Sequence, residues 1–284
     1  LKGDVLDKQI HYWKNKLEGI ESLAFPTDYP RPAQIDYSGG DLSFSLDKEL
    51  SQQLKDLSNE KGCTLYSTLL TGFYILLHKY TGQEEILIGT PIANRHFSQL
   101  EDMIGFFVNS LPIAQVIKGV DNTSDLITQV HQGLVEAQSH QDIPFEKIVE
   151  ELDVKQDSSR HPIFQIMFGL QNFGESKSDY FKNANIESNY HIAKYDLSLF
   201  LSEHDDHILG SFNYATSLFN QETIERIIIH YQEILKQLVT GQNKIIQSYQ
   251  ILTAEEYQTI VYDWNATDKA YPKDKTIYQL FQEQ

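Results

Sequence analysis

Residues 195–219, YDLSLFLSEHDDHILGSFNYATSLF, decide the fold class of this chain. On both sides of the centre, apolar and polar residues alternate with a period of two, a pattern typical of β-strands. The centre, Glu203–His207, is a polar run of the kind that joins two strands in a hairpin. Two histidines flank two aspartates in this run, which is also compatible with a metal site. A turn accounts for the same composition, and we predict no metal here.

Helical and strand-like segments alternate along the rest of the chain, so the hairpin belongs to a mixed α/β body. A loop rich in proline and glycine, residues 25–41, separates the first helix from this body. The apolar spacing predicts helices over residues 4–18, 47–61, 64–80, 123–138, 144–152 and 220–239. Further extended segments are predicted at residues 42–46, 85–93, 103–117 and 162–173.

Composition excludes several classes of function. The 284 residues are enough for one large domain or two of ordinary size. With 40 acidic against 23 basic residues, the formal net charge of −17 repels phosphate backbones and excludes nucleic acid as a partner. No apolar run approaches the roughly 20 residues that a membrane span requires. The single cysteine, Cys63, excludes an internal disulfide and favours a cytoplasmic protein.

The two ends of the chain differ in character from its middle. The chain begins with neither a methionine nor a signal peptide, so we expect it to be the interior of a longer chain. Residues 252–284 contain a short helical segment, an irregular polar stretch over Asn265–Lys275 and the first turns of a further helix. This order of segments is typical of a linker followed by the beginning of another domain.

The polar cluster His140–Gln141–Asp142 precedes an amphipathic helix that opens on Pro144. Either His140 and Asp142 are the acid/base pair of an enzyme, or the cluster is only the corner at which the helix begins. An aspartate at a helix entrance is first of all a cap, which accepts hydrogen bonds from the free N–H groups of the first turn. We therefore predict that Asp142 caps this helix.

Two further polar side chains stand out. Arg160 precedes a buried strand, and its planar guanidinium is expected to anchor a loop carboxylate or carbonyl rather than to take part in catalysis. Asn109 lies in an otherwise apolar extended segment, where an unpartnered side-chain amide costs about 1–3 kcal/mol. Asn109 therefore either ties two strands together or faces a cavity, and the residues alone leave both open. No motif of a self-contained active site occurs in the sequence.

At these three places the sequence resembles the last three motifs of condensation domains from nonribosomal peptide synthetases. The matching segments are IGFFVNSLPIA (104–114), HQDIPFE (140–146) and DSSRHPIF (157–164), in the order and at the spacing of the family. YWKNKLEGI (12–20) is similar to the segment that joins the two lobes of such domains. Residues 252–284 resemble the condensation–adenylation linker and the opening of an adenylation domain.

The resemblance implies a domain organisation. Residues 1–20 would be the inter-lobe helix, 21–250 the C-terminal lobe of a condensation domain, 251–273 the linker and 274–284 the start of the adenylation domain. The lobe would have a fold like that of chloramphenicol acetyltransferase, an α+β mixed sheet covered by helices. The family's HHxxxDG motif lies in the N-terminal lobe, and no His-His pair occurs in this chain. The chain would therefore be half of a condensation domain.

The resemblance also implies an activity, performed in multimodular synthetases that make antibiotics and other secondary metabolites. The amine of an acceptor aminoacyl thioester attacks a donor acyl or peptidyl thioester, and an amide forms. Both substrates are carried on the phosphopantetheine arms of carrier proteins, and the chain itself would bind no cofactor directly. The partners would be the donor and acceptor carrier proteins, the missing N-terminal lobe and the downstream adenylation domain. We expect the chain alone to be inactive.

The resemblance implies two kinds of role for residues of this chain, lining the tunnel and supporting the site. It implies no catalytic residue in this chain. The residues expected to line the tunnel between the lobes are Gly105, Phe106, Phe107, Asn109 and Ser110. The residues expected to support the site are His140, Gln141, Asp142 and Arg160. Two alternatives stay open: a non-catalytic condensation-like scaffold or recruitment domain, and a relative that performs epimerisation or heterocyclisation. An intact HHxxxDG motif upstream would favour catalysis.

Overall fold

The computed structural model describes residues 3–95, 103–105, 107–154, 157–171, 191–204, 206–241, 244–270 and 272–284. The chain forms two compact units, Leu1–Ile251 and Leu252–Gln284. The first unit contains the sheet, the long helices and all three motif segments.

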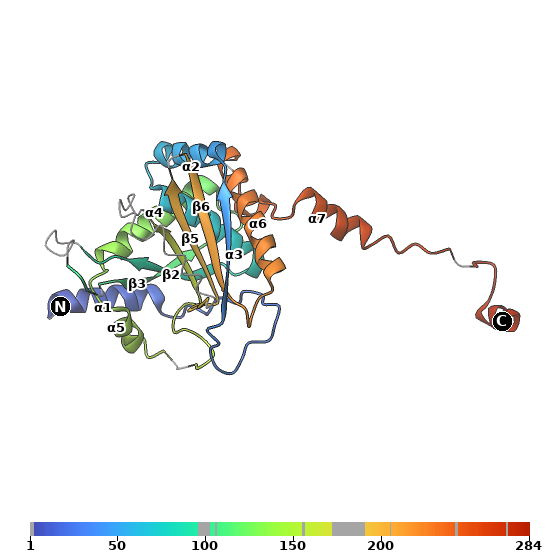
Figure 1. The fold of residues 1–284 in the computed structure, drawn as a ribbon, viewed down its shortest axis with the longest axis horizontal. Coiled ribbons are helices and arrows are strands. Elements are labelled where there is room, and N and C mark those ends of the chain that lie inside the picture. Colours follow the sequence, from blue (N-terminus) through green and yellow to red (C-terminus); the bar gives the residue numbers. More distant parts are fainter. Residues whose placement is uncertain are drawn as a thin grey trace, which may run out of the picture. The chain divides into compact units, whose positions relative to one another are not determined.

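A mixed sheet forms the centre of the first unit (Figure 1). The strands in the described part of the chain are β1 (Gly39–Leu46), β2 (Glu85–Ile92), β3 (Asn109–Val116), β4 (Ile166–Gln171), β5 (Leu197–His204) and β6 (His207–Ala215). They lie in the order β1-β6-β5-β4-β2-β3. The pairs β2–β4 and β4–β5 are parallel, and the other pairs are antiparallel. The predicted hairpin is confirmed as β5 and β6, which pair down to His204 and His207.

Helices cover one face of this sheet (Figure 1). They are α2 (Lys48–Glu60), α3 (Leu65–Thr81), α4 (Thr123–Ser139) and α6 (Gln221–Thr240). The ring of Phe73 on α3 contacts those of Phe168, Phe212 and Tyr231, with centroids 5.6, 6.3 and 6.1 Å away. These rings come from β4, β6 and α6, so the sheet and its helices share one apolar core.

Local sequence signals set the ends of the helices. The carboxylate of Asp47 accepts from the N–H of Leu50 at 2.8 Å at the start of α2, and Thr64 caps α3 in the same way. Gly82 ends α3 in the left-handed region, at a φ of 69°, which a residue with a Cβ adopts only at a cost. All six helices predicted for this unit are confirmed, with ends that differ by one residue at most.

α1 (Asp4–Leu17) and α5 (Phe145–Glu151) pack against each other, and α5 also contacts β3. Of the described residues in the extended segment predicted at 103–117, those of β3 form a strand, and Met103–Gly105 has no regular structure. Within the described ranges, no helix is long and apolar enough to cross a membrane.

The second unit consists of short helical segments. They are α7 (Ala254–Gln258), a π-helical turn over Thr259–Asp263 and α8 (Ile277–Glu283), and none of them contains a buried residue. Trp264, Ile277 and Phe281 are 70%, 87% and 80% exposed. Its helices therefore bury no apolar core of their own. Its assignment to a linker and the start of an adenylation domain stays a prediction.

Candidate functional site

A cavity of about 730 Å³ lies where β3, the start of α5 and the loop before β4 meet. All three motif segments contribute to its lining, with Phe107–Ser110, then Asp142 and Pro144–Glu146, then His161 and Pro162. Met167, Lys194 and Tyr195 are among the other lining residues. Of the predicted tunnel residues, Phe107, Asn109 and Ser110 lie in this cavity. Gly105 is outside its lining, and Phe106 is outside the described residues.

The side-chain amide of Asn109 holds the corner before α5 to the start of β3. Its Nδ2 donates to the carbonyl oxygens of Gln141 and Ile143 at 3.1 and 2.8 Å. Its Oδ1 accepts from the N–H groups of Phe145 and Ser110 at 3.0 and 2.9 Å. Asn109 thus lines the cavity, but its amide is used to tie a strand to a helix corner. A side chain bonded in this way is fixed in one orientation.

The corner formed by His140, Gln141 and Asp142 is where α1 docks. The imidazole of His140 stacks on the ring of Tyr12, with centroids 3.9 Å apart and planes 4° from parallel. The carbonyl oxygen of His140 accepts from the indole N–H of Trp13 at 2.9 Å. Asp142 accepts from the Nε2 of Gln9 at 3.2 Å. The corner therefore carries the first helix on one side and binds Asn109 through its carbonyls on the other.

The prediction that Asp142 caps α5 is wrong. The N–H of Phe145, the first residue of α5, donates to Asn109, and Pro144 at the cap position supplies no side-chain acceptor. Asp142 instead accepts from Gln9 on α1. The acceptor for the helix entrance comes from a neighbouring strand, and the spacing of residues around the helix contains no sign of it.

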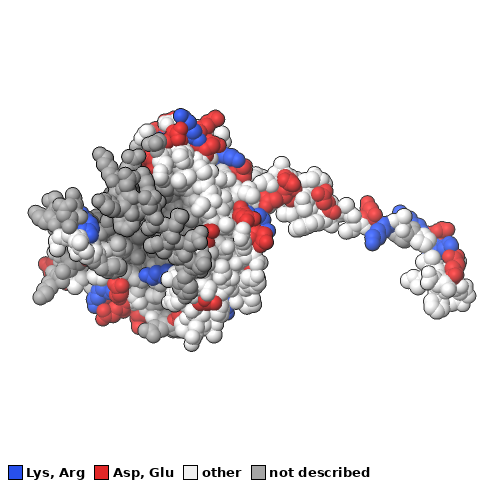
Figure 2. Space-filling view, viewed as in Figure 1, with Lys and Arg blue, Asp and Glu red and all other residues white. Residues whose placement is uncertain are grey.

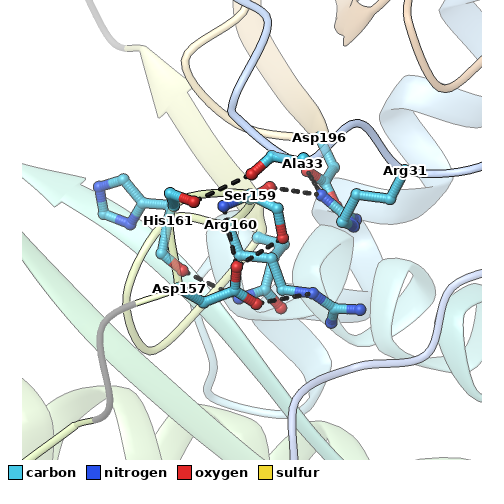
Figure 3. Close-up of polar contacts among 9 residues, drawn as sticks. Arg31, Ala33, Asp157, Ser159, Arg160, His161 and Asp196 are labelled. Carbon is cyan, nitrogen blue, oxygen red and sulfur yellow. Dashed lines mark hydrogen bonds and ion pairs between the residues drawn. The ribbon is translucent and has the colours of Figure 1, made fainter.

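The loop before β4 is anchored by Arg31, which the sequence did not single out. Figure 3 shows Arg31 beside Asp196, with a hydrogen bond to the loop at Ser159. Its guanidinium donates to the carbonyl oxygen of Ser159 at 3.2 Å and to both carboxylate oxygens of Asp196, one of them at 3.0 Å. The side chains of Arg31 and Asp196 are only 21% and 19% exposed. This two-bond ion pair is therefore largely withdrawn from water.

The ion pair of Arg160 stabilises the loop less than predicted. Its Nε lies 3.8 Å from the carboxylate of Asp157 in the same loop, and both side chains are partly exposed. An exposed ion pair at this distance adds little stability. The hydroxyl of Ser158 reaches outside the loop, to the carbonyl oxygen of Ala33 at 2.9 Å. The anchor is thus the segment around Arg31, which lies far away in the sequence.

His161 lies in the cavity wall among aromatic rings. Its ring centroid is 4.6 Å from that of Tyr195, 5.3 Å from that of Phe164 and 5.6 Å from that of Phe145. Burial lowers the pKa of His161, against the opposing effect of a hydrogen bond to the carbonyl of Pro162. Because a carbonyl oxygen can only accept, the proton of the neutral ring lies on Nδ1 in this bond. His161 is therefore neutral at neutral pH.

Acidification is expected to destabilise the protein through His161. Because the pKa is lower in the folded than in the unfolded chain, the unfolded chain binds a proton first as the pH falls below about 6.5, and stability is lost there. Above that pH, His161 is neutral in both the folded and the unfolded chain, so it does not change the free energy of unfolding. His161→Asn should therefore lose less stability than wild type on acidification, measured by urea midpoints from neutral to mildly acidic pH. His11→Asn, at an exposed position on α1, should keep the wild-type slope, and equal slopes for both variants would contradict the prediction.

Gly89 on β2 gives room to the ring of Phe164, which packs against His161 and Tyr195 of the cavity wall. A Cβ at this position would lie 2.0 Å from the ring of Phe164, which is 1% exposed and has little space to move. Gly89→Ala is expected to lower the free energy of unfolding by about 1–3 kcal/mol through overpacking. Gly133→Ala is the control, because nothing lies within 4 Å of a Cβ there. Urea unfolding should separate the two variants, and equal midpoints would disprove the close contact.

The fold class of this protein is a mixed α/β fold like that of chloramphenicol acetyltransferase. It has a mixed sheet, helices on one face of that sheet and a cavity built from three separated segments. The family model described as condensation domain matches residues 1–261. The chain belongs to the condensation-domain family of nonribosomal peptide synthetases.

Relatives of known identity are much longer than this chain. Gramicidin S synthase 2 of Aneurinibacillus migulanus is 41% identical over 287 residues, which cover 100% of this chain and 6% of that protein. Surfactin synthase subunit 1 of Bacillus subtilis (strain 168) is 40% identical over 281 residues, which cover 98% of this chain and 8% of that protein. The chain therefore spans less than a tenth of either relative.

Solved structures confirm the predicted fold, which is that of chloramphenicol acetyltransferase-like condensation domains. A four-domain nonribosomal peptide synthetase bound to AMP and glycine matches with a TM-score of 0.80 at 28% identity, over 89% of this chain and 21% of that chain. The X-domain from teicoplanin biosynthesis matches with a TM-score of 0.79 at 24% identity, over 88% of this chain and 58% of that chain. The second likeness concerns the fold alone.

Proposed function

We propose that this chain is part of a condensation domain that joins a donor acyl or peptidyl thioester to an acceptor aminoacyl thioester, both bound to carrier proteins. The observation that carries this proposal is the cavity, in which all three condensation motif segments meet. The acceptor amine attacks the donor thioester carbonyl, the amide bond forms, and the donor carrier leaves as a free thiol.

The contribution of this cavity is to hold reactants in place. The amide of Asn109 is fully used in hydrogen bonds to the protein, and the Nδ1–H of the neutral His161 ring is bound to the carbonyl oxygen of Pro162, which leaves its Nε2 as an acceptor toward a substrate. Burial raises the pKa of Tyr195, and a hydrogen bond to Ser110 partly offsets that rise. Holding two tethered reactants together can lower the barrier by about 7–11 kcal/mol. The proton-transfer groups would belong to the HHxxxDG motif of the missing lobe, so the chain alone is inactive.

The proposed partners are a donor and an acceptor carrier protein, the N-terminal lobe and the adenylation domain downstream. Phosphopantetheine enters as the arm of each carrier-bound substrate. The chain has a net charge of −17, and Figure 2 shows acidic and basic side chains mixed over α2. A carrier of like charge would therefore be recognised through local contacts rather than through the overall field.

The test is amide formation from loaded donor and acceptor carrier proteins, measured by mass spectrometry of the carrier-bound product. This chain alone is compared with the chain rejoined to an N-terminal lobe that contains HHxxxDG. We expect product only with the rejoined protein, and none when the second histidine of HHxxxDG in that lobe is replaced by alanine. Product from the chain alone would show that the missing lobe is not required.

Two other results would change the proposal. No product from a folded, rejoined protein would favour a non-catalytic condensation-like scaffold or recruitment domain. A rejoined protein that inverted the α-carbon of the donor residue, or that cyclised a cysteine or serine side chain onto the new amide, would be an epimerisation or heterocyclisation relative. Chiral analysis and the mass of the released product separate these results from simple condensation.

A further inference from the structure

Two side-chain amides hold the corner before α5 from opposite sides. On one side, Gln9 of α1 is only 5% exposed. Its Oε1 accepts from the N–H of Ile143 at 2.9 Å, and its Nε2 donates to the Oδ2 of Asp142 at 3.2 Å. On the other side, Asn109 of β3 binds the carbonyl oxygens of Gln141 and Ile143. Ile143 therefore has its N–H fixed by Gln9 and its carbonyl fixed by Asn109.

This double attachment lies directly behind the cavity wall. Asp142 and Pro144, on either side of Ile143, both line the cavity, and so does Asn109. Ile143 itself is completely buried, so its peptide groups have no water to turn to if either amide is removed. A change in the position of Gln9 would therefore move two wall residues and reorient Asn109.

Attachment of α1 to the body of the protein does not itself require Gln9. Trp13 is 1% exposed and donates to the carbonyl oxygen of His140, and Leu17 is also buried. Lys14 adds an ion pair to Glu151 on α5, with 2.9 Å between Nζ and Oε2. A buried glutamine in addition to these contacts costs desolvation unless both ends of its amide are bonded. The two hydrogen bonds of Gln9 therefore serve to fix the backbone position of the corner.

We propose that Gln9 is a positioning residue of the cavity, through which α1 sets the position of the wall formed by Asp142, Pro144 and Asn109. The functional part of this inference rests on the proposed function, in which the cavity holds the reactants in place. The structural part stands on the hydrogen bonds alone. Gln9 touches no substrate in this scheme and acts through the corner.

The first test measures hydrogen–deuterium exchange at single backbone amides by NMR in this chain. Gln9→Met keeps the length and the burial of the side chain but removes both hydrogen bonds. Phe145 is the decisive reporter, because its N–H donates to Asn109, whereas the hydrogen bonds of Gln9 go to Asp142 and Ile143. We expect its exchange to be at least tenfold faster in Gln9→Met. Leu76 in the core of α3 reports global unfolding and should exchange at an unchanged rate.

The matched control is Lys14→Met, which removes the ion pair between α1 and α5 and leaves the hydrogen bonds of the corner intact. It should leave exchange at Phe145 unchanged. The inference is overturned if Phe145 is unaffected in Gln9→Met, if its rate rises only as much as that of Leu76, or if Lys14→Met produces the same effect.

A rescue variant tests the pairing directly. Gln9→Glu should accelerate exchange at Phe145, because it places a carboxylate against that of Asp142. Adding Asp142→Asn restores a donor and an acceptor with the direction of the bond reversed, while the acceptor for the Ile143 N–H is kept. The exchange rate of Phe145 should be at least threefold slower in the double variant than in Gln9→Glu alone, and so nearer to the wild-type rate. Additive effects of the two changes would refute the pairing.

The second test uses the chain rejoined to its N-terminal lobe. Gln9→Met should lower kcat/KM for amide formation at least fivefold through a higher KM for the loaded carriers, and Lys14→Met should stay within twofold of wild type. An active wild type with an unaffected Gln9→Met variant would overturn the positioning role. A wild type that forms no amide is a failure of the proposed function instead, and the exchange experiment still decides whether Gln9 positions the corner.

Discussion

Replacing Asn109 by alanine is expected to lower the free energy of unfolding by about 3–4 kcal/mol. The change removes the side-chain partner of four backbone groups, the carbonyl oxygens of Gln141 and Ile143 and the N–H groups of Ser110 and Phe145. A buried polar group that loses its partner costs about 1–3 kcal/mol, and the groups beside the cavity regain part of this from water, which gives the stated sum. Urea unfolding followed by tryptophan fluorescence measures the change, because Trp13 is bound to the same corner.

Asn59→Ala and Asn109→Asp complete this experiment. Asn59 is exposed near the end of α2, and its replacement should leave the urea midpoint unchanged. Asn109→Asp keeps the acceptor for Phe145 but places an oxygen against two carbonyl oxygens, so it should destabilise at least as much as alanine. If the aspartate variant were as stable as wild type, the donor half of the amide would have no structural role.

Replacing Arg31 by methionine is expected to cost about 2–3 kcal/mol. The carboxylate of Asp196, 19% exposed, would lose both bonds from the guanidinium. Removing one partner of a fully buried pair costs about 3–5 kcal/mol, and the residual exposure of this pair reduces the figure. The loop before β4 should also loosen, because Ser159 loses its bond. Urea unfolding and proteolysis of this loop measure the two effects.

Arg160→Met is the matched control, because the same change of residue type is made at the arginine that the sequence favoured. Its carboxylate partner is 3.8 Å away and exposed, so the urea midpoint should not change. The double variant Arg31→Met with Asp196→Asn should regain part of the loss, since no unpaired charge is left. Equal destabilisation by the two single arginine variants would mean that the loop is not anchored by Arg31.

The elements of the fold were predictable because each leaves a periodic pattern in its own residues. All six helices of the first unit were predicted to within one residue at each end, and the hairpin of β5 and β6 was visible in its alternation. The start of β3 was predicted too early, because the apolar residues at 103–108 have the composition of a strand but pairing with β2 begins at Asn109.

The candidate site was only partly predictable. The three motif segments pointed to the cavity, and Asn109 was noticed because an amide in an apolar segment needs partners. Gln9 and Arg31 were missed, since a glutamine on a helix and an arginine in a proline-rich loop are unremarkable by composition. Their partners, Asp142 and Asp196, lie 133 and 165 residues further along the chain.

The sequence alone predicts where the six helices of the first unit begin and end, that β5 and β6 form a hairpin, and which three segments resemble condensation domains. The tertiary structure alone decided that Asn109 rather than Asp142 caps α5, and that Arg31 rather than Arg160 anchors the loop before β4. The physical reason is the range of the interactions. Periodicity follows from backbone geometry within a few residues. The partner of a side-chain amide or guanidinium depends on which backbone groups meet when distant segments pack together.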